Sequence, residues 1–263
     1  MSFETISLTT DARGVATLTL DRAEKHNSLS ATMINELTAV AELLNNDNAI
    51  RVVVLTGAGE SFCAGGDLGW MREQFHADRT TRMSEARKLA AMLKALNELR
   101  KPLIGRVQGQ AFGGGIGMMS VCDTVVAVDT AKFGLTEVRL GLIPATISPY
   151  VLARMGEGKA RRVFMSARIF DAAEARDLDL VAKVVSVDDL DDAVEVEIKP
   201  YLSAAPSAVA ASKALARSLG PDISDAVVED TIRRLADTWE TPEAREGIGA
   251  FFDKRKPDWV LKG

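Results

Sequence analysis

Three consecutive glycines, Gly113–Gly115, stand between two apolar runs and strongly constrain how this chain can fold. The run before them, 103–107, has the length of a buried strand, and the run after them, 116–121, is apolar and helix-like. Glycine at such a junction indicates positive φ or a close approach by another group. A glycine turn that opens a helix also leaves free N–H groups at the positive end of the helix dipole. The stretch therefore predicts a place that holds a negatively charged oxygen.

Two nucleotide-binding interpretations of this glycine run fail. A dinucleotide fingerprint requires G-x-G-x-x-G, but Met118 occupies the position three residues after Gly115. A P-loop requires Gly-Lys-Ser/Thr after its glycines, and none follows here. Two interpretations stay open: a glycine-rich helix start that only permits close packing, and an oxyanion hole.

A second glycine loop favours the oxyanion hole. Residues 52–57 have the pattern of a buried strand, and they lead into a glycine-containing loop, 58–68, that opens into a helix. Two strand–loop–helix units of this kind can bring two backbone N–H groups to one point. Acyl transfer and enolate chemistry require that arrangement.

Four ordered motifs resemble the signatures of the crotonase superfamily, the enoyl-CoA hydratase/isomerase family. They are LDRAEKHNSL at 20–29, SFCAGGDL at 61–68, GQAFGGGIGM followed by CD within 109–123, and FGLTEVRLGLIP at 133–144. The first departs from the family pattern, because Ala23 stands where proline is usual. The resemblance covers nearly the whole chain. It is highly specific for the fold and for acyl-CoA thioester substrates, and much less specific for the reaction.

The resemblance implies an α/β fold in which ββα turns stack into a spiral, followed by a C-terminal helical trimerisation region. We expect the spiral core with the acyl-CoA site over residues 1–196 and the helical oligomerisation region over 197–263. Within the core, residues 161–180 have the pattern of two short helices. The family forms trimers or dimers of trimers, so this chain is expected to be a homotrimer or a hexamer.

The catalytic groups are also implied by the resemblance. The backbone N–H groups of Gly66 and Gly114 are the expected donors to the thioester oxygen. Glu137 matches the acid/base glutamate of the later motif. The family's other glutamate corresponds to Gly117, so one of the two acid/base groups is absent here.

The residues themselves support a role for Glu137. It lies in the mostly apolar run 133–144, where a carboxylate is seldom buried unless it is paired. Burial among apolar groups raises a carboxyl pKa toward values that are useful in catalysis. The alternative is a structural ion pair between Glu137 and Arg139.

Further residues are expected to contact the substrate. In the family the segment 21–29 touches the CoA moiety, so His26 is expected on the surface or beside CoA rather than in catalysis. Basic residues at 254–256 are expected either at the CoA phosphates or in a solvated tail. Residues 146–150 depart from the family's glycine-rich run and would change specificity for the acyl chain. The expected substrate-binding residues are Lys25, His26, Leu29, Ala64, Asp67, Leu68, Gly117, Phe251 and Lys254.

Three functions fit a site with one glutamate. We favour a hydratase that adds water across an α,β-unsaturated acyl-CoA thioester, with Glu137 as acid/base. The stretch FGLTEVRLGLIPATISPY at 133–150 resembles the branch of 3-methylglutaconyl-CoA or isohexenylglutaconyl-CoA hydratases of bacterial leucine and acyclic terpene breakdown. Those substrates carry their own carboxylate; the room left by Gly117 would admit that group, with Arg139 or a nearby helix N-terminus as counter-charge. An isomerase needs only one base to move a proton between carbons. The third alternative is a catalytically weak acyl-CoA-binding protein.

Composition argues against several other classes of protein. The net charge of -5 and the pI near 5.3 argue against nucleic acid as the main partner, because phosphate binding needs a basic surface. No apolar run reaches the roughly 20 residues of a membrane span, so no membrane partner is expected. With two cysteines and two histidines, we expect no disulfide framework, no metal site and a reducing cytoplasmic location. Coenzyme A is part of the substrate, and no separate cofactor is expected.

Overall fold

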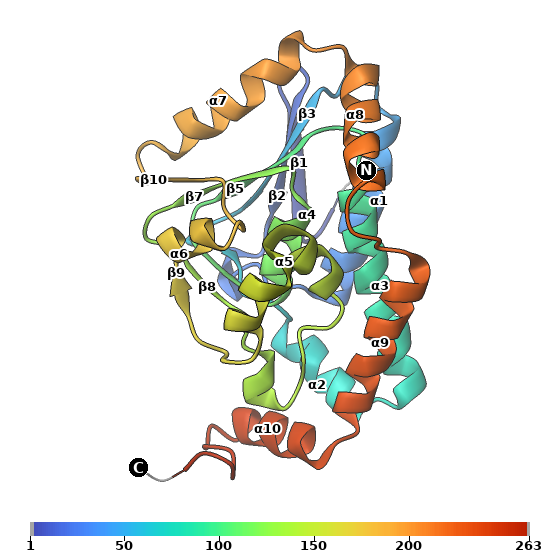
Figure 1. Ribbon diagram of the computed structural model, residues 1–263, viewed down its shortest axis with the longest axis vertical. Helices are drawn as coiled ribbons and strands as arrows, with labels where there is room; N and C mark the ends of the chain where they lie inside the picture. Colours follow the sequence, from blue (N-terminus) through green and yellow to red (C-terminus); the bar gives the residue numbers. More distant parts are fainter. Residues whose placement is uncertain (1–2, 262–263) are drawn as a thin grey trace.

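The computed structural model describes residues 3–261, which form two β-sheets surrounded by helices (Figure 1). The large sheet has the strand order β1-β2-β3-β5-β7-β10, and the small sheet has the order β4-β6-β8-β9. The β1–β2 and β8–β9 pairs are antiparallel, and the other strand pairs are parallel. The strands are β1 (Ile6–Thr10), β2 (Val15–Leu20), β3 (Val52–Gly57), β4 (Ser61–Cys63), β5 (Leu103–Val107), β6 (Gln110–Phe112), β7 (Thr124–Val128), β8 (Lys132–Gly134), β9 (Phe170–Asp171) and β10 (Lys183–Val185).

The chain alternates between the two sheets. β3, β5 and β7 of the large sheet each lead to a strand of the small sheet, respectively β4, β6 and β8, and each pair then enters a helical segment. This is the stacked ββα arrangement that the motifs predict, and the α/β fold class is confirmed. The helices are α1 (Ala31–Asn46), α2 (Leu68–His76), α3 (Arg79–Asn97), α4 (Gly114–Val121), α5 (Ser148–Phe164), α6 (Ala172–Asp177), α7 (Leu190–Ser203), α8 (Pro206–Ser218), α9 (Asp225–Trp239) and α10 (Pro242–Phe252), with short 3₁₀ helices η1 (Ala23–Lys25) and η2 (Glu137–Leu140).

The main elements follow from their sequence patterns. β3 is buried along its whole length, as expected for a parallel strand that is covered on both faces. α1 begins at an N-cap, where Ser30 Oγ accepts a hydrogen bond from Met33 N at 3.2 Å. Its buried residues recur at helical spacing and face the main core: Met33, Ile34, Leu37, Val40, Ala41 and Leu44. Among the residues that the structure describes, no helix is long and apolar enough to cross a membrane.

One predicted stretch differs. Residues 161–180 do not form two short helices, because residues 161–164 are the end of the long helix α5, and Phe170–Asp171 is strand β9. The Phe170 ring lies against that of Phe133, with the ring centroids 5.9 Å apart, and β9 pairs with β8. A two-residue strand leaves no periodicity in a sequence, so this contact could not be read from the local pattern. The second predicted helix of the stretch is present as α6.

The predicted domain boundary at 196/197 falls inside α7, whose buried residues belong to the main core. A boundary at Ala204–Ala205, between α7 and α8, would divide no helix. The division into a core and an oligomerisation region stays a prediction.

The last two helices return to the earlier part of the chain. α9 lies alongside α3, and α10 passes beneath the body of the molecule next to η2 (Figure 1). α10 and η2 pack closely because Gly247 of α10 faces the backbone of η2, and Gly141, which follows η2, faces the backbone of α10. A Cβ atom on Gly247 would lie 2.6 Å from the carbonyl carbon of Leu140, and one on Gly141 would lie 2.6 Å from the carbonyl carbon of Glu243. Any larger side chain at either position would separate α10 from η2.

Candidate active site

A cavity of about 560 Å³ lies where the two glycine loops meet. Its walls come from both loops, from η2, and from helices α1, α2, α3, α9 and α10. A larger groove, of about 1120 Å³, lies between α5 and α8 and includes neither glycine loop nor Glu137. The smaller cavity is therefore the one in which the motif residues converge.

The parallel pairing of β4 with β6 brings the glycine loops together. Each strand ends at the same edge and leads through glycines into a helix, α2 or α4. Gly65 and Gly113 have positive φ values of 91° and 46°, which explains the need for glycine at these two turns. A Cβ atom on Gly65 would lie 3.1 Å from the Phe112 carbonyl oxygen and 3.9 Å from Gly114 N. The loops are thus in direct contact.

Two N–H groups at this contact have no acceptor among residues 3–261. Leu29 N donates to Gly65 O at 2.8 Å, and Asp67 N donates to Leu29 O at 3.0 Å. These two hydrogen bonds form a parallel β-bridge between Leu29 and Gly66. They involve the residues on either side of Gly66, and the Gly66 N–H takes no part in them. Gly114 is the first residue of α4, where an N–H has no intrahelical partner. Both glycines line the cavity.

Glu137 begins η2 and faces the same junction. A Cβ atom on Gly113 would lie 2.9 Å from Glu137 Oε1. Glu137 is partly buried as a residue, but its Oε2 atom is fully buried and has no hydrogen-bond partner among the described residues. Burial raises the pKa of this carboxyl to about 7, although a hydrogen bond from its own backbone N–H opposes the rise. No ion pair between Glu137 and Arg139 is present in the described part of the chain, so the structural-pair alternative is not supported.

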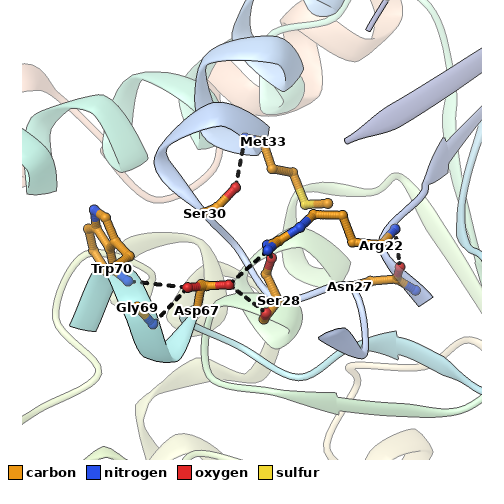
Figure 2. Close-up of polar contacts among 8 residues, drawn as sticks. All are labelled: Arg22, Asn27, Ser28, Ser30, Met33, Asp67, Gly69 and Trp70. Carbon is orange, nitrogen blue, oxygen red and sulfur yellow. Dashed lines mark hydrogen bonds and ion pairs between the residues drawn. The ribbon is translucent and has the colours of Figure 1, made fainter. Parts of the chain in front are cut away.

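Asp67 holds the first glycine loop in place rather than lining the cavity (Figure 2). Its carboxylate accepts hydrogen bonds from Gly69 N at 2.8 Å and Trp70 N at 3.2 Å, which cap α2. It also forms an ion pair with Arg22, whose other nitrogen donates to Ser28 O. Burial alone would raise the pKa of Asp67, but the hydrogen bonds from Trp70, Arg22 and Gly69 together lower it.

The cavity brings together seven of the expected site residues and leaves out five. The residues that line it are Leu29, Ala64, Gly66, Leu68, Gly114, Glu137 and Phe251. The residues outside it are Lys25, His26, Asp67, Gly117 and Lys254. Lys25, His26 and Lys254 are exposed, so contacts from them to the CoA portion of a substrate stay predictions.

The expected room at Gly117 is absent. A Cβ atom there would lie 2.5 Å from Ile147 Cγ2, and 3.0 Å from Ile147 Cβ. The isoleucine fills the space that a larger residue at 117 would need, and Gly117 is itself buried. The prediction that this position admits a substrate carboxylate is therefore wrong. The position of the family's second glutamate, residue 117, is therefore packed against the Ile147 side chain and does not open into a pocket.

Three polar residues of the cavity wall were not predicted as site residues: Gln74 on α2, Arg82 on α3 and Thr136 before η2. Thr146, before α5, also lines the wall, as the expected effect of residues 146–150 on acyl-chain specificity requires. Thr146 begins the stretch that departs from the family's glycine-rich run, and that departure is a signal in the sequence. Gln74 and Arg82 lie in polar helices, where the sequence gives no sign that they face a cavity.

Comparisons with known proteins agree with this geometry. The sequence profile of the enoyl-CoA hydratase/isomerase family matches residues 10–262. A "probable enoyl-CoA hydratase" of Rhizobium meliloti is 34% identical, covering 98% of this chain and 99% of the relative. The crystal structure of an enoyl-CoA hydratase from Shewanella pealeana is 38% identical, with a TM-score of 0.80 over 98% of this chain and 96% of that one. One from Mycobacterium avium is 31% identical, with a TM-score of 0.85 over 98% and 100%.

These matches, the ββα spiral and the paired glycine loops define an acyl-CoA enzyme of the crotonase superfamily. Within that superfamily, the chain belongs to the enoyl-CoA hydratase/isomerase family.

Proposed function

We propose that this enzyme adds water across the double bond of an α,β-unsaturated acyl-CoA thioester. The observation that carries the proposal is the position of Glu137. Its Oε2 atom is buried and has no hydrogen-bond partner among the described residues, and the carboxyl lies beside Gly113 in the cavity that both glycine loops line. A carboxyl with a pKa of about 7 can both take up and release a proton near neutral pH.

The oxyanion hole in this proposal consists of the Gly66 and Gly114 N–H groups. They donate to the thioester oxygen and stabilise the negative charge that develops there when the enolate forms. Losing one donor of this kind costs roughly 3–4 kcal/mol in comparable sites. Both donors are backbone groups, so their role does not depend on a side chain.

One glutamate can carry both proton transfers. Glu137 takes a proton from water while the water oxygen bonds to the β-carbon, and the electron pair of the double bond moves to the enolate. Glu137 then returns the proton to the α-carbon, which regenerates the carboxylate and completes a syn addition. Water is consumed, and no cofactor is required beyond the coenzyme A of the substrate.

The acyl chain in our proposal carries a carboxylate, as in 3-methylglutaconyl-CoA. Two arginines on the cavity wall, Arg82 and Arg139, support this choice, since neither forms an ion pair within residues 3–261. We place the carboxylate near these arginines and away from Gly117. A complex with the substrate carboxylate far from both would contradict the assignment.

An isomerase is the second candidate function. Glu137 is the only carboxylate on the described cavity wall, and a single base can move a proton between two carbons. A weak acyl-CoA-binding protein is the third. Glu137→Gln separates the two enzymes from the binding protein, because it should slow hydration or isomerisation by about 10²–10⁴-fold while thioester binding persists.

The first experiment follows the ultraviolet absorbance of the conjugated thioester, with crotonyl-CoA and 3-methylglutaconyl-CoA side by side. Rapid loss of absorbance with either substrate supports hydration, and loss with only the second supports a carboxylated chain. No loss with either substrate would overturn the proposal. Double-bond migration, detected by product analysis, would favour the isomerase.

Two further parts of the proposal concern the setting of the enzyme. We propose a homotrimer or a dimer of trimers in the cytoplasm, assembled through the C-terminal helices. Lys25, His26 and Lys254 are proposed to contact the part of coenzyme A that lies outside the cavity. Their exposed positions are compatible with that role.

A further inference from the structure

Four buried side-chain atoms lack a hydrogen-bond partner among residues 3–261, and three of the four residues line the candidate active site. They are Gln74 Oε1, Glu137 Oε2, Thr146 Oγ1 and Tyr150 Oη. Tyr150 lies outside the cavity, whereas the other three residues line it. Glu137 has a catalytic role in the proposed function. Gln74 and Thr146 have none, although they are only 5% and 4% exposed.

The surroundings of Gln74 and Thr146 are mostly apolar. The apolar residues that share the wall with them include Leu29, Ile34, Met71, Leu89, Leu142 and Ile147. Buried polar atoms in such a wall are normally hydrogen-bonded. A few polar groups in an otherwise apolar pocket usually fix the orientation of a ligand and determine its specificity.

Gln74 is held in position by its neighbours. Arg82 Nε donates a hydrogen bond to the Gln74 carbonyl oxygen at 2.9 Å, and the Arg82 guanidinium lies over the Trp239 ring, 5.4 Å from its centroid. These contacts join the end of α2 to α3 and α9. They fix the backbone at the helix end from which Gln74 lines the cavity.

We propose that the substrate's acyl chain bears an oxygen-containing polar group that hydrogen-bonds to Gln74 and Thr146. This inference rests on the proposed function and names the class of acyl group that the site selects. The glutamine amide and the threonine hydroxyl can each donate and accept hydrogen bonds. A hydroxyl and a carboxylate on the chain share the chemistry that these groups recognise, and a plain hydrocarbon chain leaves both groups unpaired.

Matched substrates test this directly. Three probes differ only at the sixth carbon: hex-2-enoyl-CoA ends in a methyl group, 6-hydroxyhex-2-enoyl-CoA in a hydroxyl, and hex-2-enedioyl-CoA in a carboxylate. We expect kcat/KM for at least one polar probe to exceed that for the hydrocarbon probe by about ten- to a hundredfold, because the hydrocarbon leaves buried polar groups unsatisfied. The better polar probe identifies the group, and a preference for the hydroxyl supports this inference while contradicting the carboxylate of the proposed function. A preference for the hydrocarbon, or no preference, overturns the inference.

Two substitutions locate the effect. Gln74→Leu and Thr146→Val remove the polar atoms and keep similar volumes, and each should reduce the preference for the polar probe by about tenfold. Tyr150→Phe is the matched control, since it removes an equally buried and unpartnered hydroxyl outside the cavity, and it should leave the preference unchanged. If ordered water alone satisfies Gln74 and Thr146, their variants will also leave the preference for the polar probe unchanged. That result contradicts the inference. Circular dichroism checks that each variant folds. The comparison of the three probes uses the wild-type protein, so it tests the inference even if a variant fails to fold.

A binding measurement separates this inference from the proposed function. Isothermal titration calorimetry with hexanoyl-CoA, 6-hydroxyhexanoyl-CoA and adipoyl-CoA involves no hydration step. A tenfold tighter Kd for one of the polar chains supports the inference even if no probe or crotonyl-CoA is hydrated, in which case only the hydratase assignment fails. Hydration of crotonyl-CoA with equal Kd values for the three ligands, and no kinetic preference, overturns the inference and leaves the hydratase assignment intact.

Discussion

A carboxyl group with a pKa of about 7 is half ionised at neutral pH, so the activity of Glu137 should follow its titration. As a general base it must be ionised, which means that kcat/KM for hydration rises as pH increases through about 7 and levels off above it. Glu137→Gln should lower kcat by about 10²–10⁴-fold and remove this dependence. Initial rates between pH 5 and 9 measure both effects. A wild-type profile that is flat across this range would contradict the role of Glu137 as base.

The same shift of pKa has a consequence for stability. The folded-state pKa of Glu137 is raised above its ordinary value of 4.5, so the unfolded chain ionises more readily. The free energy of unfolding therefore decreases as pH rises from about 4.5 to about 7, and the full penalty remains at higher pH. Glu137→Gln should be more stable than the wild type at pH 8, by up to about 3 kcal/mol, and this gain should vanish at pH 4. Urea unfolding at both pH values tests this, and an equal gain at both would contradict it.

Ile147 and Gly117 should be coupled in stability. A methyl group on residue 117 would lie 2.5 Å from Ile147 Cγ2, so Gly117→Ala should destabilise the fold by about 1–3 kcal/mol. Ile147→Ala removes the clashing atom, and in that background the cost of Gly117→Ala should be smaller. A double-mutant cycle of urea unfolding measures the difference. Strictly additive costs would show that the two side chains do not compete for one space.

At the scale of elements, the packing of α9 on α3 depends on apolar contact rather than on the ion pairs along its edge. Ile232 is 1% exposed and packs with Ala86 and Ala90, so Ile232→Ala should reduce stability by about 2–5 kcal/mol. Arg87 pairs with Glu229 in solvent, and Arg87→Ala should cause no measurable change. Chemical unfolding of both variants provides the comparison. If Arg87→Ala lost more stability than Ile232→Ala, the ion pairs rather than the apolar contact would hold α9 on α3.

The predictable elements are those whose cause is local. The strand–glycine–helix junctions could be predicted because each of the strands β3 and β5 is followed within about ten residues by its own glycines. The Ser30 cap of α1 is equally local, because its hydrogen bond joins residues three positions apart. By contrast, Ile147 reaches Gly117 from thirty residues away, and Gln74 shares the cavity wall with Arg82 of α3 and Trp239 of α9. Contacts of that kind are decided by tertiary packing and leave no pattern in a short window.

At the scale of the whole molecule, α8 predicts association. None of its residues is buried in the single chain, and Leu215 is 61% exposed. Apolar side chains left in water on one helix suit a contact between subunits. We expect sedimentation equilibrium to give three or six times the chain mass of 28.3 kDa, and Leu215→Asp to shift the mass downward. A monomer at all concentrations would contradict the predicted trimer or hexamer.

The close contact of α10 with η2 has a consequence for synthesis on the ribosome. Glu137 is translated about a hundred residues before α10, and both glycine loops are translated earlier still. α10 supports the turn that carries the carboxylate. A nascent chain that has not yet released residues 242–252 contains every proposed catalytic group but lacks that support. Activity should therefore appear abruptly, when the final helix emerges from the exit tunnel, rather than grow gradually with chain length.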